Sequence, residues 1–428
     1  MNSKKVPLIY NLFPRFFKTI DEWNELIPHV TEIGFNSIFV NPFHKTGFSG
    51  SLYAVKDYFS LNPLFLKDGQ DPKDFTPLKC FIENCKDNGL EVIMDLVINH
   101  TAFDANLTES HPQWYKRDDQ GKVVSPYAVD PADPSNVTVW GDLAVIDNRF
   151  STDKNGLWGY WDKLIAFYQD LGFKGLRCDA AYQVPAELWK YLIQSAKKRD
   201  SETKFYAETL GCQVKEVEAL GNVGFDYLFN SSKWWDFDGP WALEQHANFK
   251  RFAPSIAFPE SHDTERLASI APGTVEVQKF RYAFAALFSK GLLMPMGYEY
   301  GAKTKMDVVK GSPDDVDKPN WDLSGWIKRV NELKAKIPVL SEEGTWKNIC
   351  DYRFPFIFLQ KDSDSGQKSV FVGINKNMSG ETRVDEWAVP EQIKQCTSVI
   401  QLLSKDLKKE QIPSAFLFEA ADLVLFLQ

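Results

Sequence analysis

Short apolar runs alternate with longer segments of helical periodicity over about the first 335 residues of the chain. Runs such as 8–12 and 90–96 are apolar at most positions, which is typical of strands buried on both faces of a parallel sheet. This pattern predicts eight strands, at 8–12, 37–41, 91–96, 175–179, 205–208, 225–229, 257–261 and 292–296.

Helical patterns fill the intervals between these strands. Apolar spacings of three and four residues predict helices at 21–33, 75–88, 157–171, 185–198, 213–220, 241–252, 275–289 and 323–336. Repeated strand-helix units favour a parallel α/β fold, and eight of them favour a (β/α)8 TIM barrel. In such a barrel the carboxyl ends of the strands form the active-site face.

Two regions depart from this alternation. The interval from Asp95 to Asp179 is about three times as long as that from Asp179 to Glu208, which predicts an inserted subdomain after strand 3, over the barrel mouth. After Ile337-Pro338 the pattern becomes short alternating runs, which predicts a C-terminal antiparallel β domain. We therefore expect a barrel of residues 1–100 and 152–337, an inserted subdomain at 101–151 and a C-terminal β-sandwich at 338–428.

Composition narrows the class of protein. The 428 residues are 44% hydrophobic and 25% charged, with a net charge of −9 and no block of Lys or Arg, so nucleic acid is not an expected partner. No apolar window reaches the ~18 residues of a membrane span, and the first residues do not resemble a signal peptide. The six cysteines have no framework spacing, and we expect reduced thiols and a cytoplasmic protein.

Two carboxylates stand at the ends of neighbouring predicted strands. Retaining glycosidases need two carboxyl groups about 5 to 5.5 Å apart, one as nucleophile and one as acid, and Asp179 and Glu208 can meet this distance. Arg177 falls on the same strand face as Asp179, where its charge favours the ionised nucleophile. The apolar segment 205–207 before Glu208 would raise the pKa of that carboxyl, as a general acid requires.

Five ordered segments carry a family resemblance. They are Asp95-Leu96-Val97-Ile98-Asn99-His100, Gly175-Leu176-Arg177-Cys178-Asp179-Ala180, Ala207-Glu208, Ser261-His262-Asp263 and Gly297-Tyr298-Glu299-Tyr300-Gly301. In order and spacing they resemble the signature regions of the α-amylase family of glycoside hydrolases (family 13), and Tyr53-Ala54-Val55-Lys56-Asp57-Tyr58 resembles a further family segment. The resemblance runs over nearly the whole chain.

The resemblance implies a role for each matching residue. Asp179 would be the nucleophile, Glu208 the general acid and Asp263 the residue that grips sugar hydroxyls in the transition state. The substrate-binding residues would be Tyr53, Asp95, His100, Arg177 and His262. A lone Asp at a strand end is more often a helix cap, and a lone His is more often structural, but five matching segments together outweigh those readings.

The segment after the proposed nucleophile departs from the family pattern. Many members have Lys-His there, and the carbonyl of that His helps bind calcium together with the Asn of the third-strand motif, whereas this chain has Tyr182-Gln183. We expect no required cofactor. A structural calcium ion at Asn99, with Asp142 or Asp147, stays open.

The first hypothesis is a retaining enzyme that hydrolyses α-1,4-linked α-glucans or maltooligosaccharides. A glucanotransferase or maltosyltransferase that passes the glycosyl unit to a sugar is the alternative, because Tyr53 to Pro63, with Ala54, resembles the maltosyltransferase branch. Ala180 stands where that branch has Asn to hold phosphate, which disfavours phosphate as acceptor. A sugar isomerase or trehalose-forming member would use the same acids, and a noncatalytic amylase-like module that binds glycans or a partner protein is less favoured because all three acids are present.

Acceptor-side aromatics would decide between hydrolysis and transfer. The candidates are Trp234, Trp235, Phe237 and Trp241, although an aromatic residue of this kind more often belongs to the core than to a sugar platform.

Overall fold

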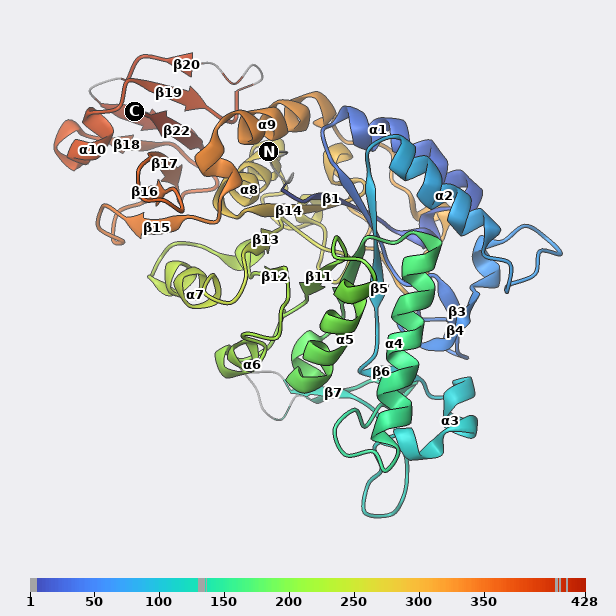
Figure 1. Ribbon diagram of the computed structural model, residues 1–428. Helices are drawn as coiled ribbons and strands as arrows, with labels where there is room; N and C mark the ends of the chain where they lie inside the picture. Colours follow the sequence, from blue (N-terminus) through green and yellow to red (C-terminus); the bar gives the residue numbers. More distant parts are fainter. Residues whose placement is uncertain (1–5, 130–134, 136, 405–406, 408, 413–414) are drawn as a thin grey trace.

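The structure is a computed structural model that describes residues 6–129, 135, 137–404, 407, 409–412 and 415–428. Eight parallel strands close into a barrel in the order β1-β14-β13-β12-β11-β10-β5-β2 (Figure 1). Their bounds are β1 (Leu8–Leu12), β2 (Ser37–Val40), β5 (Glu91–Leu96), β10 (Gly175–Cys178), β11 (Lys204–Ala207), β12 (Tyr227–Phe229), β13 (Ser255–Ala257) and β14 (Gly291–Pro295). The predicted TIM barrel is confirmed.

Helices surround the barrel on its outside (Figure 1). They are α1 (Leu26–Glu32), α2 (Thr76–Asp87), α4 (Lys154–Leu171), α5 (Ala186–Arg199), α6 (Val214–Ala219), α7 (Trp241–Phe249), α8 (Val275–Phe288) and α9 (Ser324–Lys336). Ten residues of α8 are buried, because this helix packs against both the barrel and the C-terminal domain. No helix in the described part of the chain is long and apolar enough to cross a membrane.

The seventh barrel strand ends earlier than the sequence pattern predicts. It covers Ser255–Ala257 instead of 257–261. The side chain of Ser232 accepts the N–H of Phe258 at 3.0 Å and donates to its carbonyl at 3.2 Å, and Pro259 has no N–H to give to a strand ladder. The segment from Glu260 to Asp263 is therefore irregular, which turns it across the barrel mouth.

The insertion after β5 forms small two-stranded sheets. Strand β6 (His100–Ala102) pairs with β9 (Leu143–Val145), and β7 (Tyr127–Val129) pairs with β8 (Val137–Val139), with α3 (Asn106–Ser110) between β6 and β7. Asn148 ties the returning chain to the barrel, since its side chain donates to the carbonyl of Ile98 at 2.7 Å and accepts from the indole N–H of Trp161 at 2.9 Å.

The C-terminal region is built from two antiparallel sheets. The larger has the order β15 (Thr345–Asn348), β16 (Phe356–Asp362), β17 (Ser369–Asn375), β22 (Leu423–Leu427), β19 (Ser398–Gln401) and β20 (Lys409–Glu410). The smaller pairs β18 (Thr382–Val384) with β21 (Phe416–Phe418), and α10 (Glu391–Lys394) follows β18 in the chain. Phenylalanines from both sheets form one buried cluster. The antiparallel domain is confirmed, whereas the domain boundaries stay predictions.

A buried polar network joins this domain to the amino-terminal end of the barrel. Glu343 accepts hydrogen bonds from the N–H and hydroxyl of Ser255, at 2.9 and 2.6 Å, and its carboxylate lies 3.3 Å from Nδ1 of His246. Burial would raise the pKa of Glu343, but the hydrogen bonds from His246 and Ser255 outweigh it and lower the pKa to about 2. Glu343 is therefore ionised and holds the two parts together.

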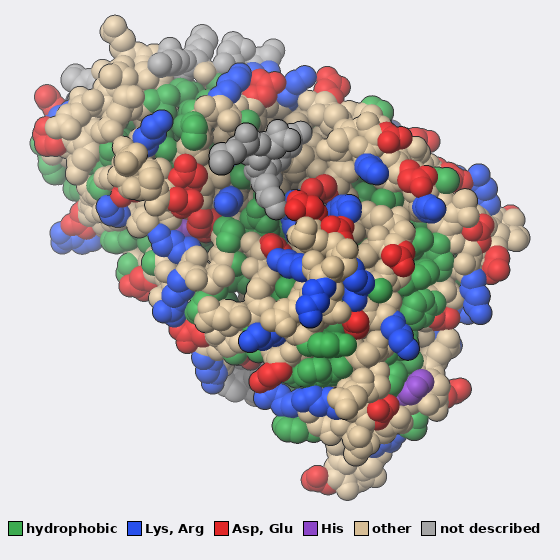
Figure 2. Space-filling model, viewed as in Figure 1, with side chains coloured by type: hydrophobic (Ala, Val, Ile, Leu, Met, Phe, Trp, Pro, Cys, Tyr) green, Lys and Arg blue, Asp and Glu red, His purple; other side chains and the backbone are tan. Residues whose placement is uncertain are grey.

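Charged side chains of both signs are distributed over the surface. On the face seen in Figure 2, blue Lys and Arg side chains are interspersed with red Asp and Glu side chains.

Candidate active site

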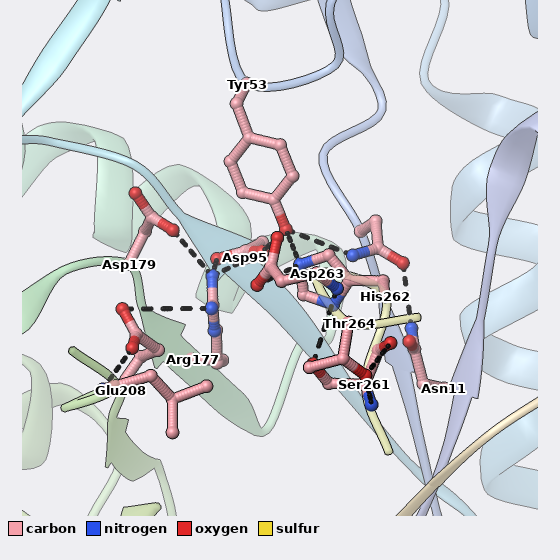
Figure 3. Close-up of polar contacts among 12 residues, drawn as sticks. Asn11, Tyr53, Asp95, Arg177, Asp179, Glu208, Ser261, His262, Asp263 and Thr264 are labelled. Carbon is pink, nitrogen blue, oxygen red and sulfur yellow. Dashed lines mark hydrogen bonds and ion pairs between the residues drawn. The ribbon is translucent and has the colours of Figure 1, made fainter. Parts of the chain in front are cut away.

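Arg177 lies at the centre of a cluster of carboxyl groups at the carboxyl ends of β5, β10 and β11 (Figure 3). Its Nη1 donates to both carboxylate oxygens of Asp95, at 2.8 and 2.9 Å, and to Oδ1 of Asp179 at 2.8 Å. Its Nη2 lies 4.0 Å from Oε2 of Glu208. One buried guanidinium therefore spans the two carboxyl groups that the sequence analysis paired.

Strand register explains this meeting. Arg177 is directly opposite Asp95 on one side and Tyr206 on the other. Because side chains alternate between the two faces of a strand, Asp179 and Glu208, each two residues further on, point to the same side as this row. Both lie just past the last paired residue of their strand, at the barrel mouth.

Glu208 is held by the main chain. Its Oε2 accepts the N–H of Ala180 at 2.8 Å and its Oε1 accepts the N–H of Leu210 at 2.5 Å. Burial raises the pKa of Glu208 to about 7, against the effect of Arg177 and with that of Asp179. The carboxyl group can thus hold a proton near neutral pH, the direction that its apolar surroundings predict.

Asp95 is completely buried beneath the site. Burial raises its pKa to about 7, and the ion pair with Arg177 opposes that rise. Asp95 also accepts the hydroxyl of Tyr53 at 2.7 Å. Asp95 therefore fixes the positions of both the Arg177 guanidinium and the Tyr53 hydroxyl.

The hydroxyl of Tyr53 determines which ring nitrogen of His262 carries a proton. Tyr53 gives its single hydrogen to Asp95, so Nε2 of His262, 2.6 Å away, must be the donor to Tyr53. Burial lowers the pKa of His262, which makes the ring neutral with its proton on Nε2. The same nitrogen lies 3.1 Å from Oδ2 of Asp263, whose side chain is 53% exposed in the mouth.

Two asparagines complete the support of Tyr53, and the sequence analysis missed both. Nδ2 of Asn41 donates to the Tyr53 hydroxyl at 3.1 Å, and Nδ2 of Asn11 donates to Oδ1 of Asn41 at 2.8 Å. Both asparagines are completely buried. An amide inside each of two otherwise apolar strand segments was the available signal, because such a group needs a buried partner.

His100 also contacts Tyr53. Its Nε2 lies 3.2 Å from the Tyr53 carbonyl, and burial lowers its pKa. The structure thus brings together all eight predicted catalytic and substrate-binding residues around one mouth (Figure 3 shows most of them).

A cavity of about 630 Å³ adjoins this cluster. It is bordered by His262 and Asp263 on one side and by the loop residues 304–315 on the other. A larger cavity of about 720 Å³ lies at the opposite, amino-terminal end of the barrel beside Leu8 and Lys334, away from the carboxyl groups. The cavity at Asp263 is the one that can serve the chemistry.

Asn99, the candidate calcium ligand, has one unused oxygen. Its Nδ2 donates to Oε1 of Gln183 at 3.3 Å, and its buried Oδ1 has no partner among the residues described here. Calcium takes six to eight oxygen ligands, usually including carboxylates. Within the described ranges no group of three His, Cys, Asp or Glu side chains could hold a metal, and a calcium ion at Asn99 stays a prediction.

The four aromatic candidates for the acceptor side separate clearly. Trp235 and Phe237 are buried in the core, whereas Trp234 is 48% exposed and Trp241 is 38% exposed. The ring of Trp234 lies 6.2 Å from that of Phe258, which borders the crevice beside Glu208. Trp234 is therefore the one of these four that is both exposed and in ring contact with a residue of that crevice.

Sequence comparisons find relatives that act on α-glucans. A sequence profile described as "Glycogen debranching enzyme, glucanotransferase domain" matches residues 8–120. The chain is 25% identical over 357 residues to the α-1,4-glucan:maltose-1-phosphate maltosyltransferase of Burkholderia pseudomallei, a match that covers 79% of this chain and 30% of that protein. It is 26% identical over 303 residues to the 4-α-glucanotransferase of Thermotoga neapolitana, covering 61% of this chain and 62% of that protein. The chain thus spans less than two thirds of the length of either relative.

Solved structures show the same fold. A noncanonic maltogenic α-amylase from Thermotoga neapolitana superposes with a TM-score of 0.74 at 20% identity, covering 98% of both chains. The trehalose-6-phosphate hydrolase of Bacillus licheniformis superposes with a TM-score of 0.76 at 13% identity, covering 99% of both chains. These likenesses extend over the barrel, the insertion and the C-terminal domain.

Proposed function

Because the chain belongs to the α-amylase family of glycoside hydrolases, we propose that it hydrolyses α-1,4-glucosidic bonds of α-glucans or maltooligosaccharides with retention of configuration. The observation that carries the proposal is the position of Arg177, which pairs with Asp179 and lies 4.0 Å from Glu208. One carboxylate and one carboxyl group with a raised pKa thus stand side by side, as acid and nucleophile must.

In the first step the Asp179 carboxylate attacks the anomeric carbon of the bound sugar. The bond to the glycosidic oxygen breaks, and the proton of Glu208 moves to that oxygen, so the leaving chain departs as an alcohol. Glu208 then becomes a carboxylate, and the N–H groups of Ala180 and Leu210 are already directed at its two oxygens. The main chain therefore stabilises the charge that the step creates.

In the second step Glu208 acts as a base. It takes a proton from water, the water oxygen bonds to the anomeric carbon, and the bond to Asp179 breaks. Two inversions at one carbon give net retention. Arg177 stays paired with Asp95 throughout, so it can stabilise the released Asp179 carboxylate without moving.

The remaining residues bind and orient the sugar. Asp263 and His262 would hold sugar hydroxyls, and the ring of Tyr53 would stack on the sugar at the cleavage point. The ring of Tyr53 lies parallel to that of His262, at 5.6 Å between centroids. Four buried partners fix its position: Asp95, Asn41 and His262 at the hydroxyl and His100 at the carbonyl.

Transfer to a sugar acceptor is the second candidate. The matched profile is that of a glucanotransferase domain, and curated relatives include a maltosyltransferase and a 4-α-glucanotransferase. In transfer, a sugar hydroxyl replaces water in the second step. Trp234, exposed beside the crevice of Glu208, supports this candidate because an aromatic face can hold an acceptor sugar.

We further propose that the protein acts in the cytoplasm and requires no calcium. All six cysteines are free thiols, which suits a reducing compartment. Around Asn99 the ligand set lacks a carboxylate cage, and no step above needs a metal. A chelator is expected to leave the activity and the melting temperature unchanged; a fall in either that calcium restores would establish the metal site instead.

Product analysis with maltoheptaose tests the proposed activity. Shorter oligosaccharides with new reducing ends, released first as the α-anomer in proton NMR, would support retaining hydrolysis, and products longer than the substrate would favour transfer. Asp179→Asn and Glu208→Gln should each lower turnover by at least about 10²-fold while the circular dichroism spectrum is kept. Near-normal rates in either folded variant would exclude the assigned roles.

A further inference from the structure

Arg15, in the short 3-10 helix Pro14–Phe16 that follows β1, is a buried cation whose hydrogen bonds all go to carbonyl groups. Its Nε donates to the carbonyl of Val308 at 3.0 Å, its Nη1 to that of Gly311 at 3.2 Å, and its Nη2 to that of Gly50. The residue is 8% exposed, and besides these hydrogen bonds the nearby carboxylate of Asp307 raises its pKa against the effect of burial. A buried charge needs strong compensation, which three carbonyl oxygens supply here.

The three carbonyls come from two loops that are far apart in the chain. Gly50 precedes Tyr53, and the N–H of Leu52 donates to the carbonyl of Val308 at 2.9 Å. Val308 and Gly311 lie in the loop that follows β14 and borders the 630 Å³ cavity. Arg15 therefore connects the segment that contains Tyr53 with the loop that lines this cavity.

The lining of the cavity indicates which part of the substrate it receives. His262 and Asp263, which would grip the sugar that stays on the enzyme, border both this cavity and the crevice of Glu208. From these two residues the cavity extends along the loop after β14, and its lining does not include Glu208, which protonates the part that leaves. The cavity is thus on the side of the retained glucosyl units. With about 630 Å³ it is large enough for more than one sugar ring.

We propose that Arg15 is a positioning residue that holds the Tyr53 segment and the 308–311 segment as one rigid wall, and thereby sets the preference for longer α-glucan chains. The identity of the substrate rests on the proposed function. The role of Arg15 in holding the two segments together rests on its three hydrogen bonds. The planar guanidinium matches three carbonyls at fixed directions, which the single ammonium of lysine cannot reproduce.

Gly311 shows how closely the wall is packed. A Cβ at this position would lie 2.5 Å from the carbonyl oxygen of Asp307, 3.2 Å from the ring of Phe13 and 3.5 Å from Cδ of Arg15. A methyl group there must displace the main chain at Asp307, whereas its distance to Arg15 is an ordinary van der Waals contact. Gly311→Ala therefore disturbs the same wall without removing the charge.

The test measures chain-length preference in Arg15→Lys, Arg15→Met and Gly311→Ala. The ratio of kcat/KM for maltoheptaose to that for maltotriose should fall at least tenfold, mainly through KM for maltoheptaose. Lys334→Met is the matched control, because Lys334 is also a buried basic side chain whose Nζ donates to three carbonyls, those of Ala286, Ser289 and Leu340, at the opposite end of the barrel. It should lose stability and keep the ratio.

Two outcomes would overturn the inference: an unchanged ratio in folded Arg15 variants, or an equal fall of the ratio in Lys334→Met. Hydrogen exchange provides a readout that needs no activity. In Arg15→Met, amides of 50–54 and 308–311 should lose protection together while those of α5 keep it.

If the wild-type protein acts on neither maltoheptaose nor maltotriose, the proposed function fails. Hydrogen exchange alone then tests whether Arg15 holds the two segments together. Joint loss of protection then supports the positioning role, and separate or absent loss refutes it.

Discussion

The main-chain N–H of Ala180 donates to Oε2 of Glu208 at 2.8 Å, so the residue after the proposed nucleophile holds the proposed acid. Ala180 adopts a left-handed conformation with φ of 40°, which is unusual for a residue with a side chain. This backbone conformation directs the N–H at Glu208. The turn at Asp179 and Ala180 thus positions both carboxyl groups: Asp179 carries one, and the N–H of Ala180 holds that of Glu208.

Glu208 should set the alkaline limit of activity. Its pKa of about 7, raised by burial, means that the acid form is lost as the pH rises through 7. We expect kcat/KM for maltoheptaose to fall above about pH 7. A maltoside with a nitrophenol leaving group needs less protonation and should show a weaker decline. Activity on maltoheptaose that stays constant up to pH 9 would contradict this assignment.

Trp234 should favour transfer over hydrolysis. Trp234→Ala removes an exposed ring beside the crevice of Glu208, and the yield of products longer than maltoheptaose should fall about threefold to tenfold relative to hydrolysis. Trp241→Ala is the control, since Trp241 is similarly exposed and its Nε1 donates to Asp236 at 3.3 Å. Equal effects of both substitutions would exclude a specific acceptor role for Trp234.

His44 should destabilise the fold in acid. It is buried against the ring of Phe43, 4.6 Å away, and neither ring nitrogen has a hydrogen-bond partner among the described residues. Burial lowers its pKa to about 3, below the ~6.5 of an unfolded chain, so the stability present above pH 6.5 is lost progressively as the pH falls toward 3.

His44→Phe should therefore raise the free energy of unfolding by about 1 kcal/mol at pH 8, and flatten its decline between pH 6.5 and 3. Urea denaturation measures both. His29→Phe is the contrasting variant and should be destabilised, because Nε2 of His29 lies 3.0 Å from the buried carboxylate of Glu299. A clear loss of stability in His44→Phe would mean that the imidazole has a partner such as an internal water.

Glu343 should anchor the C-terminal domain to the barrel. Its folded pKa of about 2 lies below the ~4.3 of an unfolded chain, so it contributes roughly 3 kcal/mol above pH 4.3, which is lost as the pH falls toward 2. Glu343→Gln should lower the free energy of unfolding at pH 7 by about that amount. Glu342→Gln, at a partly exposed neighbour, should have a much smaller effect. Equal effects in the two variants would show that Glu343 is not the anchor.

The sequence determined the barrel and the positions of Asp179 and Glu208 at its strand ends. Buried parallel strands are apolar on both faces, so their ends can be recognised locally, and Asp179 and Glu208 follow directly after β10 and β11. Local patterning failed at the seventh strand, where the side chain of Ser232 and the missing N–H of Pro259 end the ladder at Ala257. The N–H of Phe258 goes to Ser232, 26 positions earlier in the chain, and not to the strand ladder, which no local pattern shows.

Only the tertiary structure decided what holds these residues in place. Asn11 in β1 and Asn41 directly after β2 support Tyr53, and Arg15 reaches Val308 across 293 positions of the chain. No periodicity encodes such contacts, because each joins single residues from separate elements that meet only when the barrel closes. The same closure buries Glu208 and so raises its pKa, which turns a carboxylate that the sequence could locate into an acid.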